Sequence, residues 1–507
     1  MGSFKFKYIY LSIGIALLII GHCQLAQAQD YLKMGTQEQE KAHLDKAIEY
    51  YGLAIKQNPK LLPAYIKRGL CYQDLSDFDQ ALSDFKKANE LRPDNPDIEM
   101  SMGTTYFHLK DYQNALTYLN DALDKMPDNA NAQFDLGLTK TELKDYYGAL
   151  KAFNKAIDLS SEKPQFYYSR ALAKDQLRDF KGAMDDCSTA IKLRADYEKA
   201  YYLRAKEENE LRMYKEALED LAADIKINPK NTRYYAEKAD VEYHQGFLAA
   251  CIADCNIAIG LNSIFGEPYY SKALAERDSG MMDSAKADMA TANKLFKGKS
   301  PLVWMEMSKI LIYTGDYANA AQCAQKVLDI NPKYMYGAYE LAYSETFMGN
   351  DSGAAKILNH IIKTDTSFTM AYWLLGRINY LKGDSTVANQ YFDRGIQSKA
   401  DPVGVAFCYA FKGIEFIGNG DKTFSLLQKL IQYYEAAGLR IKKRDGFADV
   451  AYGYGVLKNR GKFFEYINKA LSEGYSNKGW IENSKELDYL RAEPTYKELA
   501  TKFGLKN

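Results

Sequence analysis

The chain has 507 residues, of which 47% are hydrophobic and 26% charged, and its 66 Lys and Arg balance 66 Asp and Glu. The zero net charge argues against an electrostatic binder of nucleic acid, which needs a basic excess. The hydrophobic fraction argues against a disordered chain. Few helix breakers are present, with 12 prolines and 34 glycines, whereas 41 tyrosines are an unusually high number. This composition favours a helical protein.

The first 28 residues have the pattern of a secretory signal peptide. Lys5 and Lys7 precede an apolar run over 8–21, and Ala26-Gln27-Ala28 follows as a small-x-small cleavage pattern. We therefore expect export to the periplasm, the cell surface or the medium. Removal of residues 1–28 leaves 64 basic and 66 acidic residues.

Two alternatives for this segment stay open. A retained membrane anchor is disfavoured because the run is shorter than the ~20 residues that cross a bilayer as a helix. A lipid anchor on Cys23 is disfavoured because His22 stands where bacterial lipoproteins carry a small residue. No other segment of the sequence is apolar enough to predict a membrane span.

A small residue recurs every 34 positions along the chain. The column runs through Ala47, Ala81, Ala115, Ala149, Ala183, Ala217, Cys251 and Ala285, then resumes after one extra residue at Ala320, Ala354 and Ala388. A second small column lies twelve residues earlier, from Gly35 to Gly376, and a third lies seven residues later, from Ala54 to Ala292. A fixed period of this kind is the signature of a repeat architecture.

Each repeat contains two bursts of apolar residues at helical spacing. Tyr65, Gly69 and Tyr72 mark one predicted helix, and Phe85 and Ala88 mark the next, with a short turn at 75–78. Proline two residues after several second helices ends them, because it cannot donate the next backbone hydrogen bond.

On these residues the chain resembles the tetratricopeptide repeat (TPR) family, whose unit is a helix–turn–helix of ~34 residues. The resemblance covers about eleven repeats over 29–402. It implies an all-α, right-handed superhelical α-solenoid in which the first helices line a concave groove. Two weaker repeats are expected in 403–475, at about 406–439 and 447–475, with residues 440–446 as a linker between them. Residues 476–507 are expected to form capping helices.

Two columns change charge together between the helices of a repeat. Five repeats carry a cation thirteen residues before the Ala column and an Asp three residues after it, while the other six carry no charge at either position. Because an unpaired charge is costly in a half-buried seam, we expect a structural ion pair in each of the five. The pairs are Arg68/Asp84, Arg170/Asp186, Arg204/Asp220, Lys238/Asp254 and Lys272/Asp288.

Motifs for catalysis or metal binding are absent from the sequence. The five histidines show no ligand spacing, and no phosphate loop or nucleophile elbow is present. Cys251 and Cys255 are expected to be core residues rather than a metal or redox pair, because both fall in core columns. We therefore expect no enzyme activity, no cofactor and no metal.

An aromatic stripe follows one face of the predicted first helices. This face points away from the small-residue seam and is expected to be open to solvent. Exposed rings in a groove suit peptide recognition, although these rings could instead only pack on neighbouring repeats and stiffen the array. The aromatic members are Phe107, Phe134, Tyr168, Tyr202, Tyr243, Tyr270, Tyr339, Tyr343, Trp373 and Tyr380.

An acidic column runs beside this stripe, at Glu40, Asp74, Glu142, Glu210 and Asp278. No Lys or Arg occurs in the first eight repeats of that column. The groove is therefore expected to prefer a neutral or basic extended segment of a partner.

The leading hypothesis is an exported, non-enzymatic scaffold that binds other proteins through its groove. One alternative is an accessory module that serves an enzyme or a secretion or assembly machine. Another is recognition of cell-envelope glycan by the aromatic stripe, because aromatic faces also stack on sugars. The sequence leaves the oligomeric state and the identity of the partner open.

Overall fold

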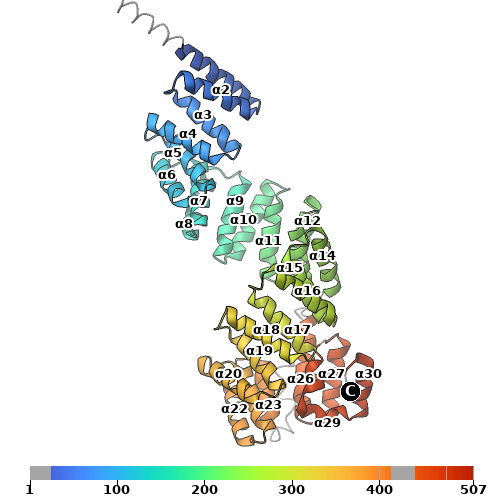
Figure 1. Cartoon of the computed structure of the whole chain (residues 1–507). Coiled ribbons are helices and arrows are strands. Elements are labelled where there is room, and N and C mark those ends of the chain that lie inside the picture. The colour runs from blue at the N-terminus through green and yellow to red at the C-terminus, as the bar shows by residue number, and fades with distance from the viewer. Residues whose placement is uncertain (1–23, 399, 413–439, 476, 506–507) are drawn as a thin grey trace, which may run out of the picture. The chain divides into compact units, whose positions relative to one another are not determined.

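The computed structural model describes residues 24–398, 400–412, 440–475 and 477–505. Over these ranges the chain consists of consecutive helices and turns and contains no β-strand (Figure 1). The predicted all-α solenoid of helix–turn–helix repeats is confirmed. The chain falls into two compact units, an N-terminal unit within Met1–Leu211 and a C-terminal unit within Arg212–Asn507.

In the N-terminal unit, a helix over 24–40 is the first helix of the first repeat. The later first helices are α3 (Leu62–Asp74), α5 (Pro96–His108), α7 (Ala130–Glu142), α9 (Pro164–Gln176) and α11 (Glu198–Glu210). The second helices are α2 (Leu44–Gln57), α4 (Phe78–Leu91), α6 (Tyr112–Lys125), α8 (Tyr146–Leu159) and α10 (Phe180–Leu193).

The C-terminal unit continues the same alternation. Its second helices are α12 (Tyr214–Ile227), α14 (Leu248–Leu261), α16 (Met282–Leu295), α18 (Tyr317–Ile330), α20 (Asp351–Thr364) and α22 (Ser385–Ser398). Its first helices are α13 (Thr232–His244), α15 (Gly266–Asp278), α17 (Pro301–Tyr313), α19 (Met335–Phe347), α21 (Thr369–Leu381) and α23 (Pro402–Lys412).

The turn inside each repeat contains a left-handed residue, and in several repeats an Asp caps the helix that follows. Asp77 accepts a hydrogen bond from the backbone N–H of Gln80 and so caps α4, and Asp111, Asp145, Asp179 and Asp316 cap their helices in the same way. The residue just before the cap has positive φ, for example 62° at Lys144 and 82° at Gly280. This position is a non-glycine in the repeats up to Arg212 and at Lys458, whereas it is a glycine at 246, 280, 315, 349 and 383.

The small columns are small because a bulky side chain from the second helix lies against them. A Cβ added to Gly69 would approach the Phe85 ring to 2.8 Å, and one added to Gly103 would approach Leu119 to 2.7 Å. Both bulky residues are fully buried. The side chain of the second helix therefore fills the space between the two helices, and the seam is packed as closely as other protein interiors.

Two predicted features fall partly or wholly outside the described residues. The apolar run of the predicted signal peptide lies outside them, as does most of the predicted weak repeat at 406–439. The helix over 24–40 continues through the predicted cleavage site, where Ala28 is buried against Ala54 and Leu61.

The predicted linker at 440–446 is wrong, because α26 (Arg440–Val456) begins there. Its polar first turns suggested a loop, but its second half carries buried apolar residues such as Val450 and Ala451 that belong to a tertiary core. Tertiary packing thus overrides a weak local pattern.

The chain from α26 to its C-terminal end forms what we call the C-terminal segment, residues 440–505. It contains α26, α27 (Arg460–Ser472), α28 (Gly479–Asn483), the 3₁₀ helix η2 (Lys485–Leu487), α29 (Asp488–Arg491) and α30 (Pro494–Phe503). It shares one hydrophobic core with α19–α23, which extends from Tyr339 to Leu505. In Figure 1 this red segment lies beside the yellow and orange repeats of the same unit.

No helix among the described residues combines the length and the apolar character that crossing a bilayer requires. Within the same ranges, no group of His, Cys, Asp and Glu side chains is arranged to hold a metal ion.

Candidate functional site

The first helices of the N-terminal unit carry half-buried aromatic rings. These rings are Phe107 on α5, Phe134 on α7, Tyr168 on α9 and Tyr202 on α11. Phe134 stacks on Phe166 with ring centroids 4.6 Å apart, and Tyr168 packs on Tyr197 at 5.4 Å. Burial raises the pKa of Tyr168 to about 12. One side of each of these two rings thus packs within the array, while part of its surface stays accessible.

Four exposed acids lie at the C-terminal ends of first helices in this unit. Asp74, Glu142 and Glu210 are the last residues of α3, α7 and α11, and Glu40 ends the helix over 24–40. The backbone carbonyls at a helix C-terminus already carry partial negative charge. An acid at this position destabilises the helix. Its negative charge adds to the partial charge of the terminal carbonyls, so the electrostatic potential along this edge is negative.

Four of the five predicted ion pairs are brought together. Arg68 Nε and Nη2 donate to the two oxygens of Asp84 at 2.8 and 2.7 Å. Equivalent contacts join Arg170 to Asp186, Lys238 to Asp254 and Lys272 to Asp288. The residues of the fifth pair, Arg204 and Asp220, belong to different compact units.

One of these pairs has an additional cation that the column pattern did not reveal. Lys174 lies 2.8 Å from Asp186, so this carboxylate is shared between Lys174 and Arg170. The Arg68/Asp84 pair is consequently the simpler one for a mutational test.

In the C-terminal unit two residues of the predicted stripe are buried. Tyr339 is 8% exposed and Trp373 is 4% exposed, so the expectation of a solvent-open face is wrong for these two residues. The C-terminal segment covers Trp373, which packs edge-on against Tyr452 of α26 with ring centroids 6.1 Å apart. Tyr339 packs against Phe368, with ring centroids 5.7 Å apart. Tyr270, Tyr243 and Tyr343 are half-buried, whereas Tyr380 remains exposed.

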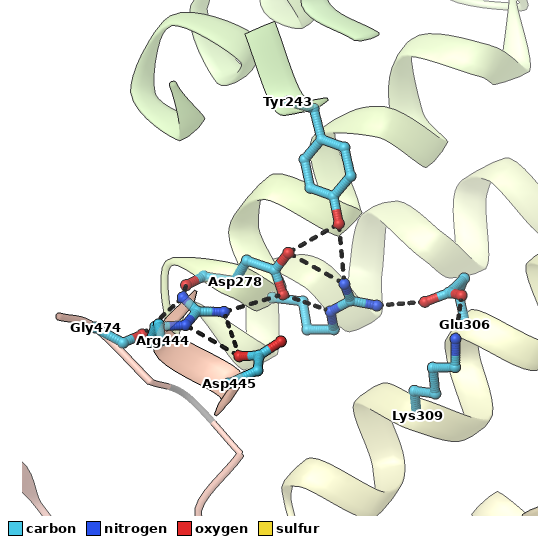
Figure 2. A network of polar contacts seen from close by, with 8 residues as sticks. Tyr243, Asp278, Glu306, Lys309, Arg444, Asp445 and Gly474 are labelled. Atoms are coloured by element: carbon cyan, nitrogen blue, oxygen red, sulfur yellow. Dashed lines mark hydrogen bonds and ion pairs between the residues drawn. The ribbon is translucent and has the colours of Figure 1, made fainter. Parts of the chain in front are cut away.

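The predicted groove acid Asp278 is also unavailable to a partner, because it is 2% exposed and lies inside a polar network (Figure 2). Tyr243 donates to Asp278 at 2.8 Å, and Arg277 donates to the same carboxylate at 2.9 and 3.1 Å. Arg277 also contacts Glu306, which accepts from Lys309 at 2.7 Å. The network therefore runs from α13 to α17.

The same network ties the C-terminal segment to α15. Arg444 of α26 donates to the backbone carbonyl of Asp278 at 2.8 Å and to that of Gly474 at 3.0 Å, as Figure 2 shows. The Arg444 side chain is buried and also pairs with Asp445 at 3.2 Å. A buried cation with several partners holds the segment in one position.

A second buried pair anchors the segment to α21. Arg377 donates to both oxygens of Glu486, each at 2.8 Å, and both side chains are almost fully buried. Burial alone would raise the pKa of Glu486, but the Arg377 charge and hydrogen bonds from Arg377 and Tyr452 hold it below its ordinary value. The paired state is thus the charged one.

The C-terminal unit contains a partly open cavity of about 270 Å³. Its walls come from α17, α19, α21, α23, α26 and α28. Most of the lining is aromatic, including Tyr313, Tyr339, Tyr343, Trp373, Tyr452 and Trp480. Lys309, Glu340 and Asp449 supply its charged groups.

The two carboxyl groups in the cavity have perturbed protonation. Burial raises the pKa of Glu340 to about 7, with Lys309 opposing and Glu306 adding to the shift. Burial also raises the pKa of Asp449 well above its ordinary value, and the negative charges of Asp445 and Asp401 add to that effect. Perturbed acids in a concave site mark it as a functional candidate.

The two cysteines that were considered as a metal or redox pair lie in the hydrophobic core. Cys251 and Cys255 are fully buried in one small core cluster with Ala239 and Ala275.

Sequence reasoning missed the cavity because the repeat pattern contains only one side of it. Most of the other side comes from the C-terminal segment, whose aromatic residues follow no repeat column. Their density, with Tyr452, Tyr454, Tyr475 and Trp480 close together, was the one available signal.

Comparisons with known proteins agree with this architecture. Sequence models of the tetratricopeptide repeat match residues 72–133, 130–163 and 302–334. No curated protein matches the chain significantly in sequence.

Several solved structures are similar to parts of the chain. YrrB, a TPR protein with an unusual peptide-binding site, is 21% identical over 35% of this chain and 90% of its own, with a TM-score of 0.31. A tetratricopeptide repeat protein from Parabacteroides merdae ATCC 43184 is 20% identical over 46% of this chain and 93% of its own (TM-score 0.39). Yeast Tom70 is 16% identical over 75% of this chain and 94% of its own (TM-score 0.38). With its repeat period, its helix–turn–helix pairs and the matching repeat models, the chain contains tetratricopeptide repeats.

Proposed function

We propose that this protein is an exported scaffold that binds an extended, neutral or basic segment of another protein along the first helices of its N-terminal unit. The observation that carries this proposal is the combination of Phe107, Phe134, Tyr168 and Tyr202 as half-buried rings on successive first helices. Such rings offer contact area at low entropic cost, which suits a protein-binding surface.

Charge supports the preference for a neutral or basic segment. The exposed acids at 40, 74, 142 and 210 lie at the C-terminal ends of first helices, where the helix dipole adds to their negative potential. This potential would steer a basic segment toward the surface and repel an acidic one.

Peptide arrays of extended basic, neutral and acidic sequences would test this function. The double variant Tyr168→Ala/Tyr202→Ala is expected to weaken binding of basic peptides about tenfold or more, because truncated aromatic anchors dominate interface energies. A matched control is Tyr147→Ala on α8, since Tyr147 is 73% exposed in the same unit but lies on a second helix. Binding that is unchanged in the double variant, or equally reduced in the control, would reject the groove.

Export is a separate part of the proposal and rests on the pattern in residues 1–28. Fractionation of the source cell with N-terminal sequencing of the purified protein tests it. We expect a mature chain that begins near residue 29 in an extracytoplasmic fraction. A cytoplasmic protein that retains residue 1 would refute export without affecting the groove.

A further inference from the structure

The cavity in the C-terminal unit is a second site, built differently from the groove of the N-terminal unit. We propose that it binds an organic cation, namely an alkylammonium or guanidinium group of the kind that lysine and arginine side chains carry. This inference goes beyond the proposed function and does not depend on it, because its residues lie in the other unit. Three features of the cavity support it, namely its charged groups, its aromatic lining and its buried polar groups without a partner.

When both of its carboxyl groups are ionised, the charges of the cavity do not balance. Lys309 is already paired with Glu306 at 2.7 Å. Glu340 and Asp449 have no hydrogen bond or ion pair with any described residue, although both side chains line the cavity. Asp445 cannot help them, since it carries negative charge itself and is paired with Arg444. A cationic ligand would supply the missing positive charge.

The aromatic walls fit the same ligand. The faces of Trp and Tyr rings attract a cation through their quadrupole, and sites for ammonium groups are built from such rings. The chain already uses this contact beside the cavity, where the Arg377 guanidinium lies 4.7 Å from the centroid of Phe347. Tyr339, Tyr343 and Trp373 are available on the cavity side.

Buried polar groups in the lining also lack partners. The Tyr339 hydroxyl, the Trp373 indole Nε1 and the Ser484 hydroxyl have no hydrogen-bond partner in the described chain, and each residue is at least nine-tenths buried. A buried polar group without a partner is costly and marks a place where a ligand or water is missing. The indole N–H donates, so the ligand should carry an acceptor such as a carbonyl close to its cationic group.

The size of the cavity limits the ligand to something small. A volume of about 270 Å³ lies just below the ~300–1,000 Å³ range of pockets for drug-sized molecules. One basic side chain with its adjoining backbone, or one free amine of similar size, fits this limit. An extended segment of several residues does not.

Isothermal titration calorimetry on the full-length protein at pH 8.5 would test the site, with Nα-acetyl-L-lysine amide as the probe. The uncharged control ligand is Nα-acetyl-L-norleucine amide, and N-acetylglucosamine tests for a neutral sugar. We expect the lysine probe to bind at least tenfold more tightly than either control. A peptide with a single central lysine then distinguishes the sources, because tighter binding than the small probe indicates a polypeptide partner. Either source supports the site.

The isosteric variants Glu340→Gln and Asp449→Asn each replace an ionisable carboxyl group with an amide of the same size. Each should weaken the lysine probe at least fivefold, while Tyr168→Ala/Tyr202→Ala in the N-terminal unit should leave it unchanged. No binding of the lysine probe to the wild type, or binding that both variants retain, would overturn the proposal. Binding of N-acetylglucosamine without the lysine probe would also overturn it and assign the cavity to neutral sugars.

A pH series on the wild type keeps the test valid if the variants fail to fold. Glu340 faces Lys309 and Glu306 from α17, and Asp449 faces Asp445 and Asp401. Because the pKa of Glu340 is raised to about 7, its carboxyl is charged at pH 8.5 and protonated at pH 5.5. Affinity for the lysine probe should fall at least tenfold between these pH values, and equal affinity at both would count against the site.

Discussion

The two units use the same repeat but treat the faces of their first helices differently. In the N-terminal unit the rings of α5, α7, α9 and α11 keep part of their surface accessible beside exposed acids. In the C-terminal unit the corresponding rings of α19 and α21 are buried, and the chain's own C-terminal segment covers Trp373 of α21. The same face of the first helices therefore keeps partly accessible rings in one unit and lines a cavity in the other.

This difference shows that an aromatic column in a repeat array has no fixed role. Its role depends on what covers it. In the C-terminal unit the covering segment is held by two buried arginines, Arg377 and Arg444, which have no counterpart on the open face of the N-terminal unit.

The largest effect is expected from breaking the Arg377/Glu486 anchor. Glu486→Gln leaves a buried guanidinium without its counter-charge, which should cost about 3–5 kcal/mol of stability in the C-terminal unit. The C-terminal segment should then be released, so that its face resembles the open one of the N-terminal unit. Limited proteolysis with mass spectrometry should show faster cleavage within residues 440–505.

The double variant Arg377→Met/Glu486→Leu serves as the control for this prediction. It removes both charges together and replaces them with apolar groups, so it should lose less stability than Glu486→Gln. If both variants are cleaved at the wild-type rate, the anchor does not hold the segment and the contrast between the units loses its explanation.

A smaller effect is expected from the ion pair inside the second repeat. Asp84→Ala leaves Arg68 unpaired in the seam and should destabilise the N-terminal unit by about 2–3 kcal/mol, whereas Asp84→Ala with Arg68→Leu should recover about 1 kcal/mol of that loss. Urea unfolding followed by circular dichroism measures both. Identical midpoints for the single and double variants would mean that the seam tolerates an unpaired charge.

The smallest effect concerns the turns, where the units differ most simply. Gly280 has φ of 82° with no atom within 4 Å of an added Cβ, so Gly280→Lys tests the backbone alone. We expect a loss of about 1 kcal/mol in the C-terminal unit, since side chains disfavour the left-handed region. The matched exchange Lys144→Gly, at φ of 62°, should change stability by less than about 1 kcal/mol in the opposite direction. Thermal melts of the two variants against the wild type would show whether the signs are opposite.

Local rules were sufficient to predict much of the fold from the sequence. The 34-residue period and the small columns predicted the helix pairs, because each depends on contacts within one repeat or between neighbours. The co-varying charges at Arg68/Asp84 were visible for the same reason, since both residues belong to one repeat. The rings of the N-terminal unit were likewise named in advance, and their role in binding a partner stays a prediction.

Tertiary structure alone decided which part of the array is covered. Asp278 looked like a groove acid and is instead a buried member of a network that reaches Arg444, 166 residues later in the chain. Residues 440–446 looked like a linker and are helical, because the C-terminal segment gains its stability from a core shared with α19–α23. A repeat pattern records only contacts that recur at a fixed separation. The closure of the cavity depends on contacts that occur once, between segments far apart in sequence, and these became visible only in the folded chain.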